Sequence, residues 1–306
     1  MEGAFDAAWQ KLQATIAQKL GRRQAGLSGR TVVGLLGRGI QASRTPAMHE
    51  REGARLGMGF AYVLIDFDEL GLADGDLARM VGEAERLGFA GLNVTHPFKQ
   101  SVLDCLDELS PEAAAIGAVN TIVFSHGRRT GHNTDSWGFA EAFREGLAGV
   151  RLGSVVQFGA GGGGAAVAHA LLASGVGALT ICDTNAARGQ ALAQRLGQRF
   201  GRQVRAVDDA VAELRAADGV VNATPLGMHK YPGMPMPAAA LEARHWVAEI
   251  VYFPAETELL RRAKGLGCRT LSGTQMAIYQ AVKAFELFTG IAPDRTAMTA
   301  HFRAAA

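Results

Sequence analysis

The hydrophobic residues of this chain follow a helical spacing at the start and then gather into short runs that alternate with helical segments. Over residues 5–20 they recur every three or four positions, which is typical of a helix with one apolar face. We expect this leading helix to pack on a domain or on a second subunit, and residues 21–29 to form a linker. Buried strands are then predicted at 31–36, 60–66 and 89–94, with helices at 47–56 and 77–87 between them.

The order strand, helix, strand, helix, strand in this region predicts a parallel, doubly wound layer. A Gly turn near residue 127 then joins two short extended segments, which indicates a hairpin. A second α/β unit begins near residue 153. Its strands are expected at 155–158, 178–183, 219–224, 247–252 and 269–271, and a long, mostly apolar helix follows from residue 273.

The composition fits a globular protein and argues against several classes of partner. The chain has 306 residues, of which 48% are hydrophobic and 20% charged, and its net charge is only +2. This charge is too small to indicate nucleic acid or an anionic membrane as a partner, and no apolar run approaches the roughly 20 residues of a membrane helix. Three widely spaced cysteines and the lack of an export signal lead us to expect a cytoplasmic location. The eight histidines form no H-E-x-x-H motif or Cys/His cluster, so no metal site is predicted.

A glycine-rich turn in the second unit predicts dinucleotide binding. Residues 159–164 read Gly-Ala-Gly-Gly-Gly-Gly and lie between a predicted strand and a predicted helix, which is the context that a G-x-G-x-x-G motif requires. Gly159 permits the tight turn, Gly161 lets backbone N–H groups approach a pyrophosphate, and Gly164 allows close packing of the helix on the strand.

The strand after this turn bears on the choice of cofactor. It ends in Asp183, whose carboxylate can accept hydrogen bonds from a ribose 2′-OH but would repel a 2′-phosphate. We therefore expect NAD to be preferred, while Arg188 close by in the sequence leaves NADP open. The strand at 219–224 leads into the turn from Pro225 to Met228, which we expect to lie beside the cofactor.

In the first unit, the strand at 89–94 leads to a lysine at the edge where open α/β sheets place their ligands. Pro97 has no N–H and ends the ladder, so Thr95 and Lys99 are held at the carboxyl end of the strand. Taken alone, Lys99 is more simply explained as a solvated lysine that begins the next helix.

Three other positions allow both a functional and a structural interpretation. Ser43 and Thr45 precede a helix N-terminus, where hydroxyls and free backbone N–H groups favour an anion, but Thr45 could simply cap that helix. Asp135 could likewise cap the helix at 136–146. Gln280 lies among apolar neighbours and is either satisfied in the core or directed into a cleft.

Seven motifs in this order resemble the shikimate/quinate dehydrogenase family, and together they extend from about residue 32 to the C-terminus. The resemblance leaves only the leading helix outside it. The motifs are Ser43-Arg-Thr45-Pro-Ala-Met-His49, Gly91-Leu-Asn-Val-Thr95-His-Pro-Phe-Lys99, Gly117-Ala-Val-Asn120-Thr, Asn133-Thr-Asp135-Ser-Trp-Gly, Gly159-Ala-Gly-Gly, Asn222-Ala-Thr-Pro-Leu-Gly-Met228 and Gly273-Thr-Gln-Met-Ala-Ile-Tyr-Gln280-Ala.

The resemblance implies a reversible, NAD(P)-dependent oxidation of the C3 hydroxyl of shikimate or quinate, with Lys99 and Asp135 as the acid/base pair. Such a reaction needs a base for the hydroxyl proton while a hydride leaves the carbon. Burial would lower the pKa of Lys99 and Asp135 would raise it, so its protonation state stays open. Ser43 and Thr45 match the groups that hold the substrate carboxylate. The residues that match the family's ligands of the ring hydroxyls are Thr95, Asn120, Asp135 and Gln280.

The same resemblance implies an N-terminal substrate-binding domain and a Rossmann-type dinucleotide-binding domain, with a cleft between them. Residues 1–28 are expected to form the leading helix and linker, 29–134 with 275–306 the substrate-binding domain, and 135–274 the dinucleotide-binding domain. The expected cofactor-binding positions are Gly159, Ala160, Gly161, Gly162, Gly163, Gly164, Asp183, Asn222, Thr224, Pro225, Met228, Val251 and Gly273.

Within the family, two positions resemble the NAD-using quinate/shikimate branch. Thr45 stands where biosynthetic members often have Ser, and Asp183 stands where NADP-using members tend to carry Asn-Arg. One alternative is a shikimate-only or aminoshikimate-type dehydrogenase, and another is a non-catalytic quinate-sensing protein on the same scaffold. A methylenetetrahydrofolate-type dehydrogenase would explain the glycine turn but not Ser43, Thr45 and Asn120. We expect a small-molecule substrate and either a monomer or a homodimer.

Overall fold

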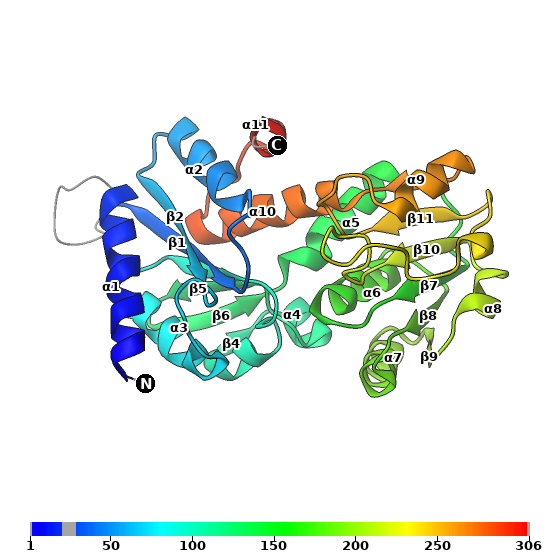
Figure 1. Cartoon of the computed structure of the whole chain (residues 1–306), viewed down its shortest axis with the longest axis horizontal. Coiled ribbons are helices and arrows are strands. Elements are labelled where there is room, and N and C mark those ends of the chain that lie inside the picture. The colour runs from blue at the N-terminus through cyan, green and yellow to red at the C-terminus, as the bar shows by residue number, and fades with distance from the viewer. Residues whose placement is uncertain (1, 20–28, 305–306) are drawn as a thin grey trace. The chain divides into compact units, whose positions relative to one another are not determined.

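The computed structural model describes residues 2–19 and 29–304, which fold into two compact α/β units (Figure 1). Unit 1 comprises the described residues up to 114 together with 118–134 and 281–304, and unit 2 comprises 115–117 and 135–280. Each unit is built on its own six-stranded sheet. The predicted linker at 21–29 lies almost entirely outside the described residues.

The strands of unit 1 form a mixed sheet in the order β2-β1-β3-β5-β6-β4. In chain order they are β1 (Thr31–Gly37), β2 (Phe60–Asp66), β3 (Gly91–Val94), β4 (Glu108–Leu109), β5 (Thr121–Ser125) and β6 (Arg128–His132). The first three are parallel, as the alternation of strands and helices predicts. β5 and β6 form the predicted antiparallel hairpin. The two-residue strand β4, which pairs with β6, has no signal in the sequence.

The helices of unit 1 cover both faces of its sheet. In chain order they are α1 (Glu2–Lys19), α2 (Thr45–Arg55), the short helix η1 (Asp74–Asp76), α3 (Leu77–Arg86), η2 (Ser101–Cys105), part of α4 (Pro111–Ile116), the end of α10 (Gly273–Thr289) and α11 (Arg295–Ala304). Crossovers between parallel strands are right-handed, so the step from β1 to β2 and the step back to β3 place α2 and α3 on opposite faces.

Two apolar layers hold unit 1 together. The larger one joins the buried face of α1 to α3 and the sheet, with Phe5, Leu12 and Ile16 as the contribution of α1. The smaller one lies on the other face of the sheet and includes Val33 of β1 and Phe288 of α10. The leading helix is thus part of the core of this unit. Burial of each such side chain contributes roughly 1.5–3 kcal/mol to the free energy of folding.

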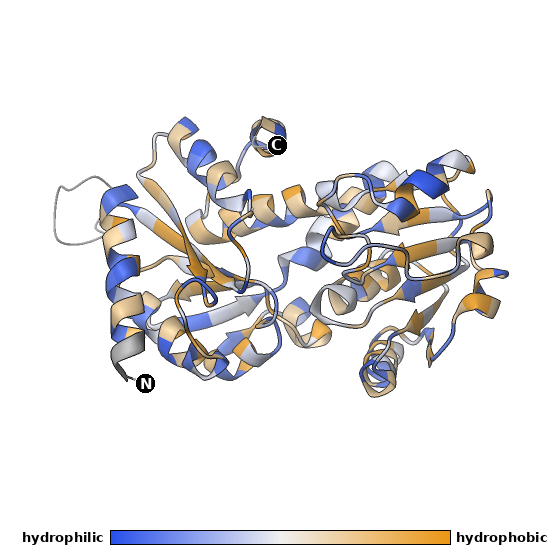
Figure 2. Ribbon diagram, viewed as in Figure 1, coloured by the Kyte–Doolittle hydropathy of each residue, from blue (hydrophilic) through white to orange (hydrophobic). Residues whose placement is uncertain are grey.

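The strands of unit 2 are all parallel and run in the order β12-β11-β10-β7-β8-β9. In chain order they are β7 (Ser154–Phe158), β8 (Ala178–Cys182), β9 (Gln203–Val207), β10 (Gly219–Asn222), β11 (Trp246–Glu249) and β12 (Arg269–Leu271). This is the strand order of a Rossmann fold. Figure 2 shows that β7, β10 and β11 are mainly hydrophobic, as expected for strands buried on both faces.

Helices connect the strands of this sheet, in which the carboxyl ends of the paired strands β7 and β10 lie beside each other. The helices are α5 (Thr134–Gly146), α6 (Gly162–Ala173), α7 (Ala186–Phe200), α8 (Val211–Leu214), the short helix η3 (Ala238–Ala240), α9 (Glu258–Gly265) and the start of α10. The strand order reverses between β7 and β10, so right-handed crossovers put α6 and α7 on one face and α9 on the other. This switch point is where such sheets bind their ligands.

Several element boundaries differ from the sequence prediction by a few residues, and two of them have a clear cause. α6 begins at Gly162 rather than at 165, because the last three glycines of the turn already form its first turn. β11 ends at Glu249 rather than at 252, because the Val251 amide donates to the Glu249 side chain instead of to a neighbouring strand. Both differences fall at the carboxyl edge of the sheet, where side chains and turns replace the sheet ladder.

Candidate functional site

The residues that the sequence predicts as functional divide between the two units. In unit 1 they are Ser43, Thr45, Thr95, Lys99 and Asn120, and in unit 2 they are Asp135, Gln280 and all of the predicted cofactor-binding positions. In both units most of them follow the carboxyl end of a strand. Asp135 directly follows the last residue of a unit 1 segment.

Lys99 lies on the segment after β3, which backbone hydrogen bonds fix at the carboxyl edge of the sheet. The Thr95 amide donates to a carbonyl of β1 (2.9 Å), and the amide of the buried Phe98 donates to the Thr95 carbonyl (2.9 Å). The Lys99 carbonyl accepts a 2.7 Å hydrogen bond from the amide of Val119, the residue before Asn120. The Lys99 side chain is half-buried. The fold of unit 1 therefore brings the segments of Lys99, Thr95 and Asn120 together.

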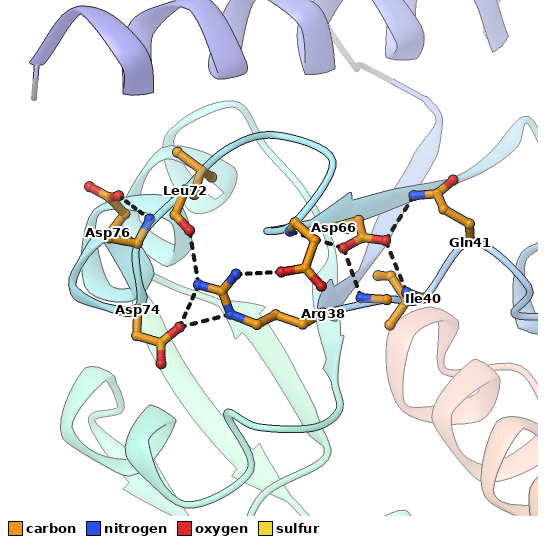
Figure 3. Close-up of polar contacts among 10 residues, drawn as sticks. Arg38, Ile40, Gln41, Asp66, Leu72, Asp74 and Asp76 are labelled. Atoms are coloured by element: carbon orange, nitrogen blue, oxygen red, sulfur yellow. Dashed lines mark hydrogen bonds and ion pairs between the residues drawn. The ribbon is translucent and has the colours of Figure 1, made fainter. Parts of the chain in front are cut away.

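The loop that leads to Ser43 and Thr45 is held by a buried carboxylate at the end of β2 (Figure 3). Asp66, only 1% exposed, accepts hydrogen bonds from the amides of Gly39 (3.0 Å) and Ile40 (2.9 Å) and from the Gln41 side chain (3.0 Å). It also accepts one from the Asp68 amide (3.1 Å). Burial by itself would raise the pKa of Asp66, but these four donors outweigh it and the pKa lies below its usual value.

Arg38 fixes the start of the same loop by bonding the segment that follows β2 (Figure 3). Its guanidinium donates to the carboxylates of Asp68 (2.6 Å) and Asp74 (2.6 Å) and to the carbonyl of Leu72 (2.9 Å). Two side chains thus clamp a short stretch of chain between β1 and α2. The next segment, which carries the hydroxyls of Ser43 and Thr45, therefore begins at a fixed position.

Thr45 is the first residue of α2, and the interpretation that it caps this helix is wrong. The capping position is Arg44, whose side chain makes no capping hydrogen bond. The Ser43 hydroxyl oxygen accepts a 3.4 Å hydrogen bond from the Thr45 amide. Both residues are half-buried, so two hydroxyls and the positive end of the helix dipole share one location, which favours an anion.

Asn120 belongs to a buried polar network that reaches the start of α5. Its side-chain carbonyl accepts hydrogen bonds from the Thr134 amide (2.7 Å) and the Thr121 hydroxyl (3.1 Å), and its amide donates to the Thr134 hydroxyl (2.9 Å). Asn93 donates to the Thr121 hydroxyl (3.0 Å) and accepts from the Tyr62 hydroxyl (2.8 Å). The backbone immediately before Asp135 is therefore tied to the strands of unit 1.

Asp135 lies inside the first turn of α5 and does not occupy a capping position. α5 begins at Thr134, and the acceptor for the Thr134 amide is the Asn120 side chain. The Asp135 side chain is 6% exposed. Gln280, the other predicted substrate ligand of unit 2, is half-buried, and its side-chain amide donates to the Ala277 carbonyl one turn earlier (3.0 Å).

The glycine turn after β7 forms a close cradle at the switch point. Gly159 has a φ of +98°, and a β carbon there would lie 2.5 Å from the carbonyl oxygen of Ala223. A β carbon at Gly164 would lie 2.3 Å from the Gly159 carbonyl oxygen, whereas one at Gly161 would meet no atom within 4 Å. No described side chain makes a capping hydrogen bond at Gly161, the residue before α6. Open space thus faces the N-terminus of a 12-residue helix, which is suited to a pyrophosphate.

Asp183 connects the end of β8 to this turn. Its carboxylate accepts hydrogen bonds from the amide of Ala160 (2.6 Å), the amide of Asn185 (2.8 Å) and the guanidinium of Arg188 (2.6 Å). Burial raises the pKa of Asp183, but these donors, Arg188 foremost, outweigh it and the pKa lies below its usual value. The side chain is therefore ionised near neutral pH.

A second buried carboxylate organises the other predicted cofactor positions. Glu249, 1% exposed, accepts hydrogen bonds from the Val251 amide (3.0 Å), the Asn222 side chain (3.0 Å) and the Thr257 hydroxyl (3.1 Å). The side-chain oxygen of Asn222 in turn accepts from the amide (3.0 Å) and hydroxyl (2.7 Å) of Thr224. The carboxyl ends of β10 and β11 are thereby locked to each other.

The remaining cofactor positions lie around these strand ends. A β carbon at Gly273 would lie 2.3 Å from the carbonyl oxygen of Ile250, so α10 begins in contact with the backbone after β11. Pro225 to Met228 form the predicted turn, closed by a 3.2 Å hydrogen bond from the Met228 amide to the Pro225 carbonyl. Pro225 and Met228 are exposed. Unit 2 therefore gathers the predicted cofactor positions around one end of its sheet.

Three side chains that shape these loops were missed by the sequence reasoning, namely Asp66, Gln157 and Glu249. Each is buried in or at the end of a strand. A signal was present in the sequence, because each is a polar residue in an otherwise apolar run. The partners of these side chains, however, include backbone groups of turns, whose geometry the sequence pattern does not reveal.

Some kinds of site are absent from the part of the chain that the structure describes. Within residues 2–19 and 29–304, no three His, Cys, Asp or Glu side chains are grouped so that they could hold a metal ion. None of the described helices is both long and apolar enough to cross a membrane.

Comparison with family models finds two matches. Residues 35–122 match the shikimate dehydrogenase substrate-binding domain, and residues 273–301 match the shikimate 5′-dehydrogenase C-terminal domain. Among curated sequences, an NADP⁺ shikimate dehydrogenase of Streptomyces avermitilis is 53% identical over 88% of this chain and 94% of its own length. An NAD⁺ quinate/shikimate dehydrogenase of Corynebacterium glutamicum is 49% identical over 89% of this chain and 97% of its own.

Solved structures of quinate and shikimate dehydrogenases also align with this chain. Quinate dehydrogenase from Corynebacterium glutamicum in complex with NAD aligns with a TM-score of 0.85 at 48% identity, covering 90% of this chain and 99% of that one. Shikimate 5-dehydrogenase from Thermus thermophilus, in complex with NADP(H) and shikimate, aligns with a TM-score of 0.79 at 35% identity, covering 90% and 100%.

Proposed function

Because this chain belongs to the shikimate/quinate dehydrogenase family, we propose that it oxidises the C3 hydroxyl of shikimate or quinate to the corresponding 3-dehydro acid. The chain is an NAD(P)-dependent oxidoreductase of the shikimate and quinate dehydrogenase type, and both kinds of relative described above are similar to it over most of their length. The finer assignment rests above all on one observation. The backbone carbonyl of Lys99 accepts a hydrogen bond from the amide of Val119, the residue before Asn120. This bond lies at the carboxyl edge of the sheet, where open α/β sheets place their ligands.

In the proposed reaction the C3–H bond and the O–H bond break together as the carbonyl forms. A bound NAD(P) would supply the acceptor for the hydride that leaves the carbon. Lys99 takes the proton from the hydroxyl, and in the reverse direction it returns that proton to the developing alkoxide. Asp135 is the second member of the proposed acid/base pair.

The other residues hold the acid in place. Ser43 and Thr45 bind its carboxylate through their hydroxyls, next to the N-terminus of α2. The ring hydroxyls are bound by Thr95, Asn120 and Gln280. Hydrogen bonds of this kind orient the reacting carbon, which contributes to catalysis by removing rotational freedom before the chemical step.

We propose that the cofactor is held by the cradle of unit 2 and that NAD is preferred over NADP. The open space at Gly161 lies at the positive end of α6, where a pyrophosphate is stabilised. Asp183 is an ionised carboxylate beside the turn, which suits a ribose 2′-OH and repels a 2′-phosphate. Its ion pair with Arg188 occupies the cation that a 2′-phosphate would otherwise attract.

Replacement of Lys99 by alanine tests the proposed chemistry. We expect Lys99→Ala to lower kcat by about 10²–10⁴-fold, because the proton acceptor is lost, while the acid still binds with an affinity close to that of the wild type. Steady-state rates and calorimetric titration with shikimate and quinate measure the two quantities. Lys264→Ala, which removes an exposed lysine paired with Glu256, serves as the matched control. A near-normal kcat in Lys99→Ala would refute the role of this residue.

A further inference from the structure

Gln157 is a polar side chain in the fully buried centre of the unit 2 sheet, directly beneath the glycine turn. It lies on β7, is 0% exposed and has apolar residues on both sides in the sequence. Its side-chain amide nitrogen lies 2.8 Å from the Gly159 carbonyl oxygen and 2.8 Å from the Gly164 carbonyl oxygen. These two glycines are the first and the last of the G-x-G-x-x-G motif, so one side chain connects both ends of the turn.

The two hydrogen bonds also fix the orientation of the side-chain amide. Only the nitrogen can donate to two carbonyl oxygens, so the Gln157 side-chain oxygen must point the other way. Among the described residues this buried oxygen has no hydrogen-bond partner. A buried acceptor without a partner lowers stability, and an apolar residue of the same size would avoid that cost. The position therefore carries a polar group whose benefit lies in the turn and not in the packing of the strand.

The turn is held from a second direction as well. The amide of Gly159 donates to the Cys182 carbonyl (2.8 Å), and the amide of Ala160 donates to the Asp183 carboxylate (2.6 Å). With these contacts and those of Gln157, the beginning and the end of the turn are fixed to β7 and β8. The part of the turn that stays open is Gly161, where a β carbon would meet no atom within 4 Å.

We propose that Gln157 is a positioning residue for the dinucleotide, holding the glycine turn in the shape that presents the N-terminus of α6 to the pyrophosphate. The inference rests on the proposed role of this turn in binding NAD(P). Gln157 is enclosed in the sheet and acts through the turn. Its loss should therefore weaken nucleotide binding without changing the chemical step or the binding of the acid.

Direct titration with NADH and NADPH, followed by nucleotide fluorescence, tests the inference without any need for turnover. Gln157→Met keeps the length of the side chain but cannot donate, and Gln157→Asn keeps the amide but is too short to reach both carbonyls. Loss of the two hydrogen bonds should raise the Kd for the preferred nucleotide about fivefold or more in either variant. KM for the nucleotide should rise in parallel, while kcat at saturating nucleotide and KM for the acid stay within about twofold.

Thr180→Val is the matched control, because Thr180 is a buried residue of the neighbouring strand β8 whose hydroxyl accepts a hydrogen bond from Arg205 of β9 (3.2 Å). Its nucleotide Kd should equal that of the wild type. A Kd within twofold of the wild type in both Gln157 variants would overturn the inference, as would equal losses in nucleotide and acid binding. If the wild type binds NADH but oxidises neither acid, the proposed function fails while the role of Gln157 is still decided by the titration.

Discussion

Glu249 shows how a single buried carboxylate can determine the pH response of this protein. Three donors from three different segments surround it, and yet burial raises its pKa from 4.5 to about 7. The folded protein therefore retains a proton that the unfolded chain has already lost between these two pH values. The associated stability is fully present below the unfolded pKa and is lost as the pH rises through about 7.

Replacement of Glu249 by glutamine should remove this pH dependence. The difference between pKa values of 4.5 and about 7, at roughly 1.4 kcal/mol per pKa unit, corresponds to about 3.5 kcal/mol. We expect the free energy of unfolding of the wild type to fall by up to that amount, relative to Glu249→Gln, between pH 4.5 and pH 8. Urea denaturation of both proteins across this range measures it. Glu256→Gln, at an exposed ion pair, is the control, and parallel curves for wild type and Glu249→Gln would contradict the account.

At the scale of elements, the predicted binding site for the carboxylate of the acid, at Ser43 and Thr45, depends on how the loop between β1 and α2 is held. The amides of Gly39 and Ile40 both donate to Asp66, so the direction in which the chain enters α2 is set by a carboxylate at the end of the neighbouring strand. An asparagine at this position could accept with only one oxygen and would turn an N–H group toward one of these amides.

Asp66→Asn should therefore weaken binding of the acid more than binding of the nucleotide. We expect KM for shikimate or quinate to rise by about tenfold, as two or more hydrogen bonds to the loop are lost, with little change in KM for NAD(P). Asp74→Asn is the matched control, since Asp74 bonds Arg38 on the same loop but is largely exposed. Equal KM values for the acid in wild type and Asp66→Asn would show that the loop does not need this clamp.

The elements themselves were largely predictable from the sequence, whereas their ends were not. Runs such as Val155 to Phe158 and the spacing of the leading helix depend on burial, which leaves a periodic signal. The start of α6 at Gly162 and the end of β11 at Glu249 depend on hydrogen bonds between distant segments. Such bonds leave no period in the sequence, and the same is true of the pairing of β4 with β6.

For the whole molecule, the parallel order of strands and the Rossmann-type sheet could be predicted, and the structure and the relatives confirm the two α/β units and the family. The candidate residues could be named, because motifs such as the one ending in Lys99 are local in sequence. What holds them could not, since Gln157, Asp66 and Glu249 act on backbone groups of turns. Their identity as polar residues in apolar strands was visible, but their partners became known only from the fold.

Oxidation of shikimate or quinate with a dinucleotide, and preferably with NAD, is the activity that we propose for this chain. It is tested by initial rates for each acid with each nucleotide, followed by the near-ultraviolet absorbance of the reduced nucleotide. We predict reduction of NAD with at least one of the two acids, at a higher kcat/KM than with NADP. A higher kcat/KM with NADP would contradict the role given to Asp183. No reduction of either nucleotide with either acid would contradict the function itself.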